Sequence, residues 1–204
     1  DDDGTYDLGS ASKEWQDIFI DGTAKIDTLT VDESATFAGA TTITTTGNEN
    51  SLSLISTDAD AQAGPILRLA RQSSSPQDGD SLGAVQWQAL DDGAGNNNMI
   101  QLIGSMTDAS AGSEDATLFH FQTIGGATVE MVRYTPTGPV FNEGSADLDF
   151  RVESNGNANM LFVDGGNDHV NIGTASDLGS TLNVEGTLGV TGVLTANAGV
   201  VIDN

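Results

Sequence analysis

Adjacent carboxylates are the first residues in this sequence that could do chemistry. Asp91-Asp92 and Glu114-Asp115 both occur in stretches rich in Ser, Asn, Asp and Gly. Two carboxyl groups held a few ångströms apart across a sugar can cleave a glycosidic bond, provided that a cleft raises the pKa of one of them. Nothing in the sequence indicates such a cleft, and in a chain with 30 acidic residues adjacent pairs are expected by chance. We therefore predict no catalytic residues.

The same carboxylates supply oxygen atoms, which are the ligands that Ca²⁺ prefers. Asp58-Ala59-Asp60 is one candidate, and Asp91-Asp92, close to three asparagines, is another. Neither has the spaced Asp/Asn loop with a terminal Glu that marks an EF-hand. We interpret both as solvated turns and predict no metal site.

The two histidines also lack partners at the spacing of metal ligands, and the chain contains no Cys for a thiolate site or a disulfide. In an assembly of three chains, copies of one histidine could meet on the axis. His169, however, alternates with Val170 and Ile172. Because these two residues are apolar, we expect them to face the interior and His169 to face outward. His120, between two phenylalanines, presents the same choice. No phosphate loop is present either, so no cofactor is predicted.

Polar loops in the middle of the chain are the candidate binding sites, because binding residues commonly lie on loops carried by a rigid scaffold. A glycan site would combine planar amide and carboxylate groups with an aromatic ring. Trp87 alternates with small apolar residues and is expected to be in the core. The candidate glycan-binding residues are Asp91, Asp92, Asn96, Asn97 and Asn98.

The charge balance excludes several classes of partner. Six basic residues face 30 acidic ones, and the formal net charge is −24. A nucleic-acid backbone or an anionic lipid surface would require Lys and Arg, and no apolar run approaches the length of a membrane span. We predict no nucleic-acid partner and no membrane insertion. Hydrophobic residues still make up 37% and are arranged periodically, which indicates a folded chain.

The period of the apolar residues is two, which is typical of half-buried strands. Two turn signals separate such strands. Gly125-Gly126 predicts a two-residue hairpin between 117–124 and 127–134, and Asn155-Gly156 predicts a type I′ turn between 148–154 and 157–163. Asp164-Gly165-Gly166-Asn167 then predicts a turn into a strand over 169–172. Alternating pairs occur at Leu67/Leu69, Val85/Trp87, Ile100/Leu102, Phe119/Phe121, Val129/Met131 and Phe150/Val152.

Both ends of the chain show a different period, of six residues. Such a period with an inner apolar pair is typical of one edge of a triangular β-helix, in which Gly permits the bend. The apolar residues that follow this step are expected to form the core along an axis. They are Val31, Phe37 and Ile43 at one end, and Leu182, Val184, Leu188, Val190 and Leu194 at the other.

Two architectures fit the six-residue period. A single-chain β-helix needs several stacked coils, whereas the tract from Leu182 onward is too short for two. Three chains wound about a common axis need only one edge each. We favour the three-chain form, which also explains a composition with much polar surface and few aromatics. The predicted fold class is all-β: an elongated trimeric fibre with triple-β-helix-like stems flanking a small β-sandwich. The predicted domains are a stem with a short Trp-containing module (1–46), the sandwich-like middle domain (47–139) and a hairpin-rich, hexad-repeat stem (140–204).

Three segments resemble modules of tail fibres from tailed bacteriophages, especially marine ones. The first is LGSASKEWQDIFIDGT at residues 8–23, and the second is DFRVESNGNANMLFVDGGNDHVNIGT at residues 149–174. The third is the final tract of Leu-x-Val-x-Gly repeats, which is similar to fibre shafts. Together they cover about half of the chain.

The resemblance implies an intertwined homotrimer on the virion tail, outside the cell. Its expected partners are other tail or fibre proteins and the host surface, where a glycan is the candidate receptor. The resemblance implies no catalytic residues in this chain. The expected function is therefore a structural, non-enzymatic fibre segment that serves host attachment. Two alternatives stay open: a polysaccharide depolymerase carried on such a fibre, and a subunit of an extracellular filament that polymerises by donating a β-strand.

Overall fold

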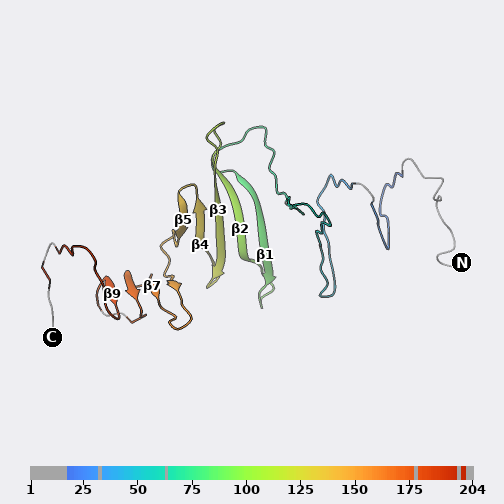
Figure 1. Cartoon of the computed structure of the whole chain (residues 1–204). Coiled ribbons are helices and arrows are strands. Elements are labelled where there is room, and N and C mark those ends of the chain that lie inside the picture. Colours follow the sequence, from blue (N-terminus) through green and yellow to red (C-terminus); the bar gives the residue numbers. More distant parts are fainter. Residues whose placement is uncertain (1–17, 32–33, 63, 177–178, 197–198, 201–204) are drawn as a thin grey trace. The chain divides into compact units, whose positions relative to one another are not determined.

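The structure, a computed structural model, describes residues 18–31, 34–62, 64–176, 179–196 and 199–200. These residues form nine strands and no helix, so none of them belongs to a helix long and apolar enough to cross a membrane (Figure 1). The prediction of an all-β chain is confirmed. The strands are β1 (Ser81–Leu90), β2 (Asn96–Asp108), β3 (Asp115–Ile124), β4 (Ala127–Thr135), β5 (Gly138–Phe141), β6 (Phe150–Val152), β7 (Leu161–Asp164), β8 (His169–Ile172) and β9 (Leu182–Val184).

Contacts divide the chain into two units, Asp1–Pro65 and Ile66–Asn204. All nine strands belong to the second unit, and the described residues of the first unit form no strand. The segment around Trp15, up to residue 17, lies outside the described residues. The domain boundaries predicted after residues 46 and 139 stay predictions.

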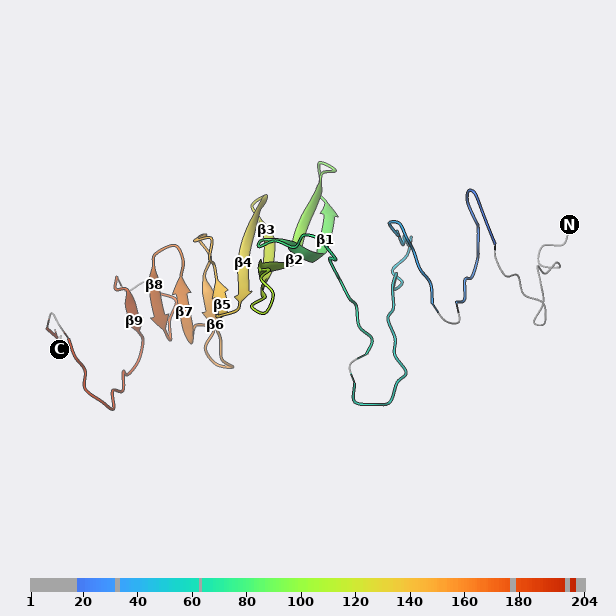
Figure 2. The same cartoon turned by 90° about the horizontal axis from the view of Figure 1, so that it is seen from above.

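The first sheet is an antiparallel meander in the order β1-β2-β3-β4-β5, in which each strand pairs with the next one along the chain (Figure 2). The sequence predicted two facing sheets here, as in a sandwich. Among the described residues of 47–139 there is one sheet, so this chain by itself does not build the second layer. The stretch with Leu67 and Leu69, predicted as a strand, is not one. Leu69 instead packs on the sheet, with its Cβ 3.1 Å from where a side chain of Gly83 would begin.

The hairpin between β3 and β4 confirms the turn predicted at Gly125-Gly126. Ile124 pairs with Ala127, which leaves two residues in the loop. Their φ angles are 58° and 83°, so both lie in the left-handed region that a type I′ turn requires. A second two-residue loop, Pro136-Thr137, joins β4 to β5.

The second sheet has the order β6-β7-β8-β9, with β8 and β9 parallel and the other pairs antiparallel. Val170 pairs with Leu182, and Ile172 with Val184. Partners in this parallel pair are therefore two six-residue steps apart in the same chain. The turn predicted at 164–167 is present, since Asp164 pairs with His169 across a four-residue loop.

The turn predicted at Asn155-Gly156 is present, because the Ser154 N–H donates to the Asn157 carbonyl at 2.7 Å across it. Its predicted type I′ geometry is wrong, since neither Asn155 nor Gly156 has a positive φ. The paired strands also end further away, with Val152 opposite Leu161. The side chain of Asn157 donates to the carbonyl of Gly173 at 3.0 Å, and its Oδ1 accepts from the Asn159 N–H at 2.7 Å. These contacts bend residues 157–160 out of the strand pairing.

The hydrophobic core of the described residues is very small. Only Val132 and Phe162 are buried apolar side chains, with 8% and 9% of their surface exposed. Most apolar side chains are therefore not covered by the chain that carries them.

Candidate interaction surfaces

The register of the β1–β5 sheet assigns its side chains to two faces. Side chains alternate along a strand, and directly paired residues share a face. Four bulges shift the alternation, because Leu82 in β1, Met99 and Thr107 in β2, and Met131 in β4 are extra residues without a partner. Sequence periodicity alone does not place these bulges.

One face carries no charge, and we call it the uncharged face. The four charged residues of the five strands, Asp108, Asp115, Glu130 and Arg133, all fall on the opposite side. The larger side chains of the uncharged face are Val85, Trp87, Ile100, Leu102, Met106, Leu118, His120, Gln122, Ile124, Val129, Val132, Tyr134 and Phe141.

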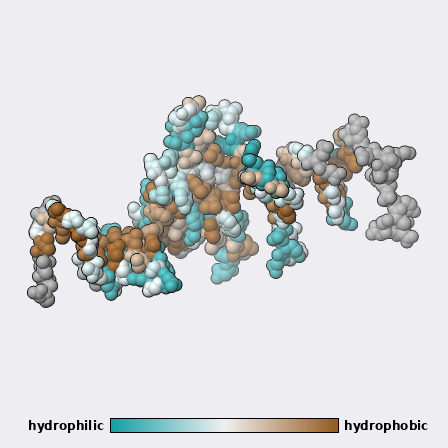
Figure 3. All heavy atoms as spheres, viewed as in Figure 1, coloured by the Kyte–Doolittle hydropathy of each residue, from teal (hydrophilic) through white to brown (hydrophobic). Residues whose placement is uncertain are grey.

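The uncharged face is open to solvent in a single chain except near Gly83, where Leu69 of the same chain packs on it. Trp87 is 49% exposed, Tyr134 52% and Phe141 51%. Trp87, expected in the core, is therefore not buried by its own chain. Of the large apolar side chains that are exposed in the five strands, all lie on this face except Leu90 at a strand end and Met99 in the bulge. Figure 3 shows hydrophobic residues at the surface over both sheets.

On the opposite side, which we call the charged face, the larger side chains pack against one another. The rings of Phe119 and Phe121 stack with their centroids 5.8 Å apart, and the Arg133 guanidinium lies 5.4 Å from the centre of the Phe119 ring. Arg133 donates to both carboxylate oxygens of Glu130, at 2.6 and 2.8 Å. Hydrogen bonding to Glu130 raises the pKa of Arg133. Thr117 beneath this cluster is only 5% exposed.

The residues predicted to bind a glycan gather at the tip of the β1–β2 hairpin, but several of them hold the tip together. Asp91 accepts hydrogen bonds from the Gly95 N–H at 2.8 Å and from the Asn97 side chain at 2.9 Å. These bonds lower the pKa of Asp91. Asn98 accepts from the side chain of Gln88. Asn96, Asn97 and Asn98 belong to β2 and not to a loop, whereas Asp92 lies in the loop and is exposed.

The second carboxylate pair, Glu114-Asp115, lies at the other end of the sheet. Backbone hydrogen bonds lower the pKa of Glu114. Among the described residues no group of three or more His, Asp or Glu side chains is arranged to hold a metal ion. Asp58 and Asp60 accept hydrogen bonds from backbone N–H groups two residues further on, as turn residues do.

The β6–β9 sheet also has two unlike faces. Its apolar face includes two predicted axis residues, Leu182 and Val184, which pair with Val170 and Ile172. Leu182 is 62% exposed. The full set on this face is Phe150, Val152, Leu161, Val163, Val170, Ile172, Leu182 and Val184.

The opposite face of this sheet carries buried amides. Asn171 is fully buried and Asn183 is 4% exposed, and Asn183 donates to Asn171 Oδ1 at 2.6 Å. His169 shares this face, opposite Val170 and Ile172, as the alternation predicted. In a single copy Val170 and Ile172 are half-buried, whereas Asn171 between them is fully buried.

The remaining predicted axis residues are exposed in a single chain. Their exposed fractions run from 47% for Val31 to 67% for Phe37 and Leu188. None of them belongs to a strand. The set comprises Val31, Phe37, Ile43, Leu188, Val190 and Leu194. Their place on an axis between chains stays a prediction.

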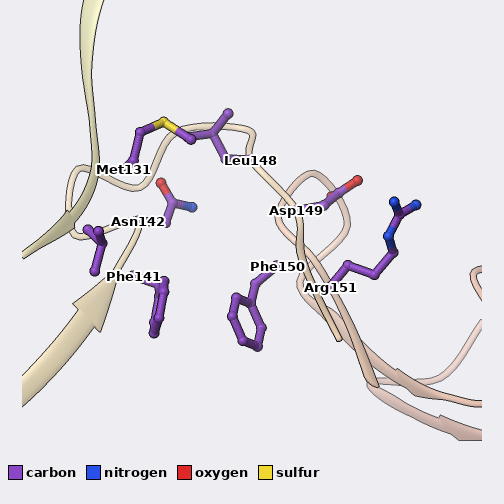
Figure 4. Close-up of a pocket in the computed structure, with 8 residues that line it drawn as sticks. Met131, Phe141, Asn142, Leu148, Asp149, Phe150 and Arg151 are labelled. Atoms are coloured by element: carbon purple, nitrogen blue, oxygen red, sulfur yellow. The ribbon is translucent and has the colours of Figure 1, made fainter. Parts of the chain in front are cut away.

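A hollow of about 320 Å³ lies where β5 leads into β6 (Figure 4). Its floor holds Phe141 from the uncharged face and Phe150 from the apolar face of the second sheet. The centroids of the two rings are 4.8 Å apart, and the rings point in the same direction in Figure 4. The apolar faces of the two sheets therefore meet at this ring pair.

The sequence matches no protein-family model, and no curated protein matches it. We therefore infer the function from the residues and surfaces of this chain.

The sequence reasoning missed the buried amides and the two-sided distribution of charge. The sequence did contain a sign of the buried amides, because Asn159, Asn171 and Asn183 are spaced by twelve residues, twice the apolar period. A signal for the second was the complete absence of charged residues from 81–90 and 96–107.

Proposed function

We propose that the chain is a structural segment of a bacteriophage tail fibre, which assembles as a homotrimer and serves attachment to the host cell. The observation that carries this proposal is that large apolar side chains on the uncharged face of the first sheet, at Val152 and Leu182 of the second sheet and along the six-residue repeats are exposed in a single copy. The resemblance of residues 8–23 and 149–174 to fibre modules supports the same proposal. The segment would lie on the virion tail, outside the cell, beside other tail or fibre proteins.

Energetics favours an assembly over a monomer. Burying a Val, Leu, Ile or Phe side chain contributes about 1.5–3 kcal/mol, and ordering each residue costs about 1–2 kcal/mol. Among the described residues only two apolar side chains are buried, which does not offset the cost of ordering those residues. Neighbouring copies that cover the exposed apolar faces would supply the missing burial. Three short hexad tracts around one axis, with triple-β-helix-like stems, are the arrangement that we propose.

A non-enzymatic role fits the titration of the candidate carboxylates. A glycosidase needs one carboxyl group with a raised pKa that can donate a proton at neutral pH. The pKa values of Asp91 and Glu114 are instead lowered, because hydrogen bonds stabilise their ionised forms. We therefore do not propose a depolymerase.

Attachment would use the exposed tip of the β1–β2 hairpin, where Asp92 is exposed. A homotrimer presents three copies of the tip, and simultaneous binding of several copies strengthens a weak interaction with a cell-surface glycan. A glycan array probed with the intact assembly tests this part. Binding that persists when residues 92–98 are replaced by a Gly-Ser loop would remove the tip from the proposal.

Native mass spectrometry of the full chain tests the assembly. The expected result is a closed trimer, whereas open filaments of variable length would support polymerisation by strand donation and a monomer would overturn the proposal. Leu188→Asp is the diagnostic variant, because three unpaired carboxylates near one axis would cost about 3–5 kcal/mol each. Thr187→Asp, at the neighbouring exposed position, is the matched control and should still form trimers.

A further inference from the structure

We infer that the uncharged face of the β1–β5 sheet is itself a contact surface between copies of this chain, so that the middle of the molecule assembles and not only its hexad tracts. This inference rests on the proposed homotrimer and goes beyond it, because it assigns one face of one sheet to the interior of the assembly. The second layer that the sequence predicted for this region would then come from neighbouring copies.

The exposed side chains of this face are of the kind that interfaces bury. Val85, Trp87 and Ile100 are 39%, 49% and 37% exposed on adjacent strands, and Tyr134 and Phe141 extend the surface to β4 and β5. Aromatic residues at the centre of an interface commonly carry much of its binding energy. An apolar face of this extent is unusual on the surface of a soluble monomer.

The distribution of charge points to a second copy as the occupant. Each copy has a net charge of −24, so copies repel wherever their acidic side chains approach one another. The uncharged face is the one side of this sheet whose strands bring no charged side chain to the contact. Like copies can therefore pack here without placing carboxylates in a medium of low dielectric constant.

The polar pair on this face can tolerate burial. His120 and Gln122 are its two hydrogen-bonding side chains at the centre of β3, and Gln122 Nε2 lies 3.4 Å from His120 Nε2. A polar group that already has a partner costs less to remove from water than one that has none. His120 neighbours Leu102 and Val132 across the strands, so no charged side chain faces it from the adjacent strands.

The face continues into the apolar face of the second sheet. The contact between Phe141 and Phe150 joins the two faces, and the second face carries Leu182 and Val184, where the six-residue repeats begin. One continuous apolar surface therefore leads from the middle sheet to the hexad tract. Chains that wind about an axis through the hexads would also meet along the uncharged face.

Thiol labelling of single-cysteine variants tests this assignment, because the chain contains no Cys of its own. Val85→Cys places a thiol on the uncharged face, and Gln86→Cys places one at the next residue of the same strand, on the charged face. Both positions are exposed in a single chain. In the assembled protein we expect a maleimide to react at least about tenfold more slowly at position 85 than at position 86, because accessibility controls thiol labelling. In denaturant the two rates should be similar.

The outcomes separate the two proposals. A trimeric mass with equal labelling at both positions would overturn the proposed interface but leave the homotrimer standing. In that case the uncharged face is open in the purified trimer, and a different protein would have to cover it in the virion. A monomeric mass would overturn both.

If Val85→Cys fails to assemble while Gln86→Cys assembles, a second measurement decides, namely the fluorescence of Trp87. In a Trp15→Phe variant, Trp87 is the sole Trp, and its fluorescence in the trimer should resist quenching by acrylamide. Emission and quenching typical of a solvated Trp would contradict the inference.

Discussion

Two buried amides illustrate how single residues stabilise the second sheet. Asn183 Nδ2 donates to Asn171 Oδ1 at 2.6 Å and to the Ser180 carbonyl at 2.9 Å, while Asn171 is fully buried. Leaving a buried polar group without its partner costs about 1–3 kcal/mol. The β8–β9 pair is therefore sensitive to changes at either asparagine.

We predict that Asn183→Ala lowers the free energy of unfolding by about 1–3 kcal/mol, because Asn171 Oδ1 and the Ser180 carbonyl lose their donor. Urea unfolding followed by circular dichroism, at one fixed protein concentration, measures the change. The double variant Asn171→Ala/Asn183→Ala should lose less than the sum of the single losses, since the two side chains are partners. Strict additivity would show that the hydrogen bond contributes nothing.

The pKa of the Asp164 carboxyl group determines how the stability of the β7–β8 turn depends on pH. The Asn167 side chain at 3.0 Å and the backbone N–H groups of Asn167 and Gly166 hydrogen-bond to its carboxylate and lower its pKa below the ordinary 3.8. Because the folded-state pKa is below the unfolded-state value, these bonds stabilise the folded chain at pH values above 3.8. The stabilisation is lost as the pH falls through the lowered folded pKa.

The expected result is that unfolding of the parent depends more steeply on pH below 3.8 than unfolding of Asp164→Asn, which cannot titrate at this position. An NMR titration of the Asp164 carboxyl carbon measures the folded pKa directly. A pKa at or above the ordinary value would refute the hydrogen-bonding account of this turn.

The β3–β4 hairpin is the element whose geometry depends most clearly on local sequence. Gly126 has a φ of 83°, where a residue with a Cβ costs about 1–2 kcal/mol. Gly126→Ala should therefore destabilise the protein by about that amount. Gly125→Asn is the matched control, because Asn-Gly is a favoured pair in a type I′ turn, and it should preserve the melting temperature. Equal losses in the two variants would mean that the type I′ geometry is not required.

Bulges decide how the strands of the first sheet present their side chains. The extra residues Met99 and Met131 shift the alternation within β2 and β4. Without the Met131 bulge, Glu130 and Arg133 could not lie on the same side, since their separation is odd. The bulge thus permits the bidentate Arg133–Glu130 pair and keeps the other face free of charge.

At the scale of the whole molecule, the net charge of −24 opposes assembly. Raising the ionic strength from about 0.01 M to about 0.15 M shortens the Debye length from about 30 Å to about 8 Å. We therefore predict that added NaCl raises the melting temperature of the proposed trimer, because it screens repulsion between copies. Calorimetry at several NaCl concentrations measures the effect, with KCl as a control for ion identity. A melting temperature that falls with added salt would show that attractive ion pairs between copies dominate.

The amino-acid sequence by itself determined the all-β class, the turn at Gly125-Gly126 and the turn at 164–167. These features depend on residues next to one another in the chain, where backbone preferences and local hydrogen bonds act. The sequence also identified the six-residue apolar step. In the parallel β8–β9 pair, two such steps separate paired residues.

Only the tertiary structure decided which side chains share a face and which are covered. The turn over Asn155-Gly156 closes without the expected type I′ geometry, and the Asn157 side chain bonds to Gly173, which is remote in sequence. In the second sheet the polar pair Asn171 and Asn183 is buried while Leu182 stays exposed. The physical reason is that bulges and burial depend on pairing between strands, and the apolar period of one strand does not by itself identify the partner strand or the position of an extra residue.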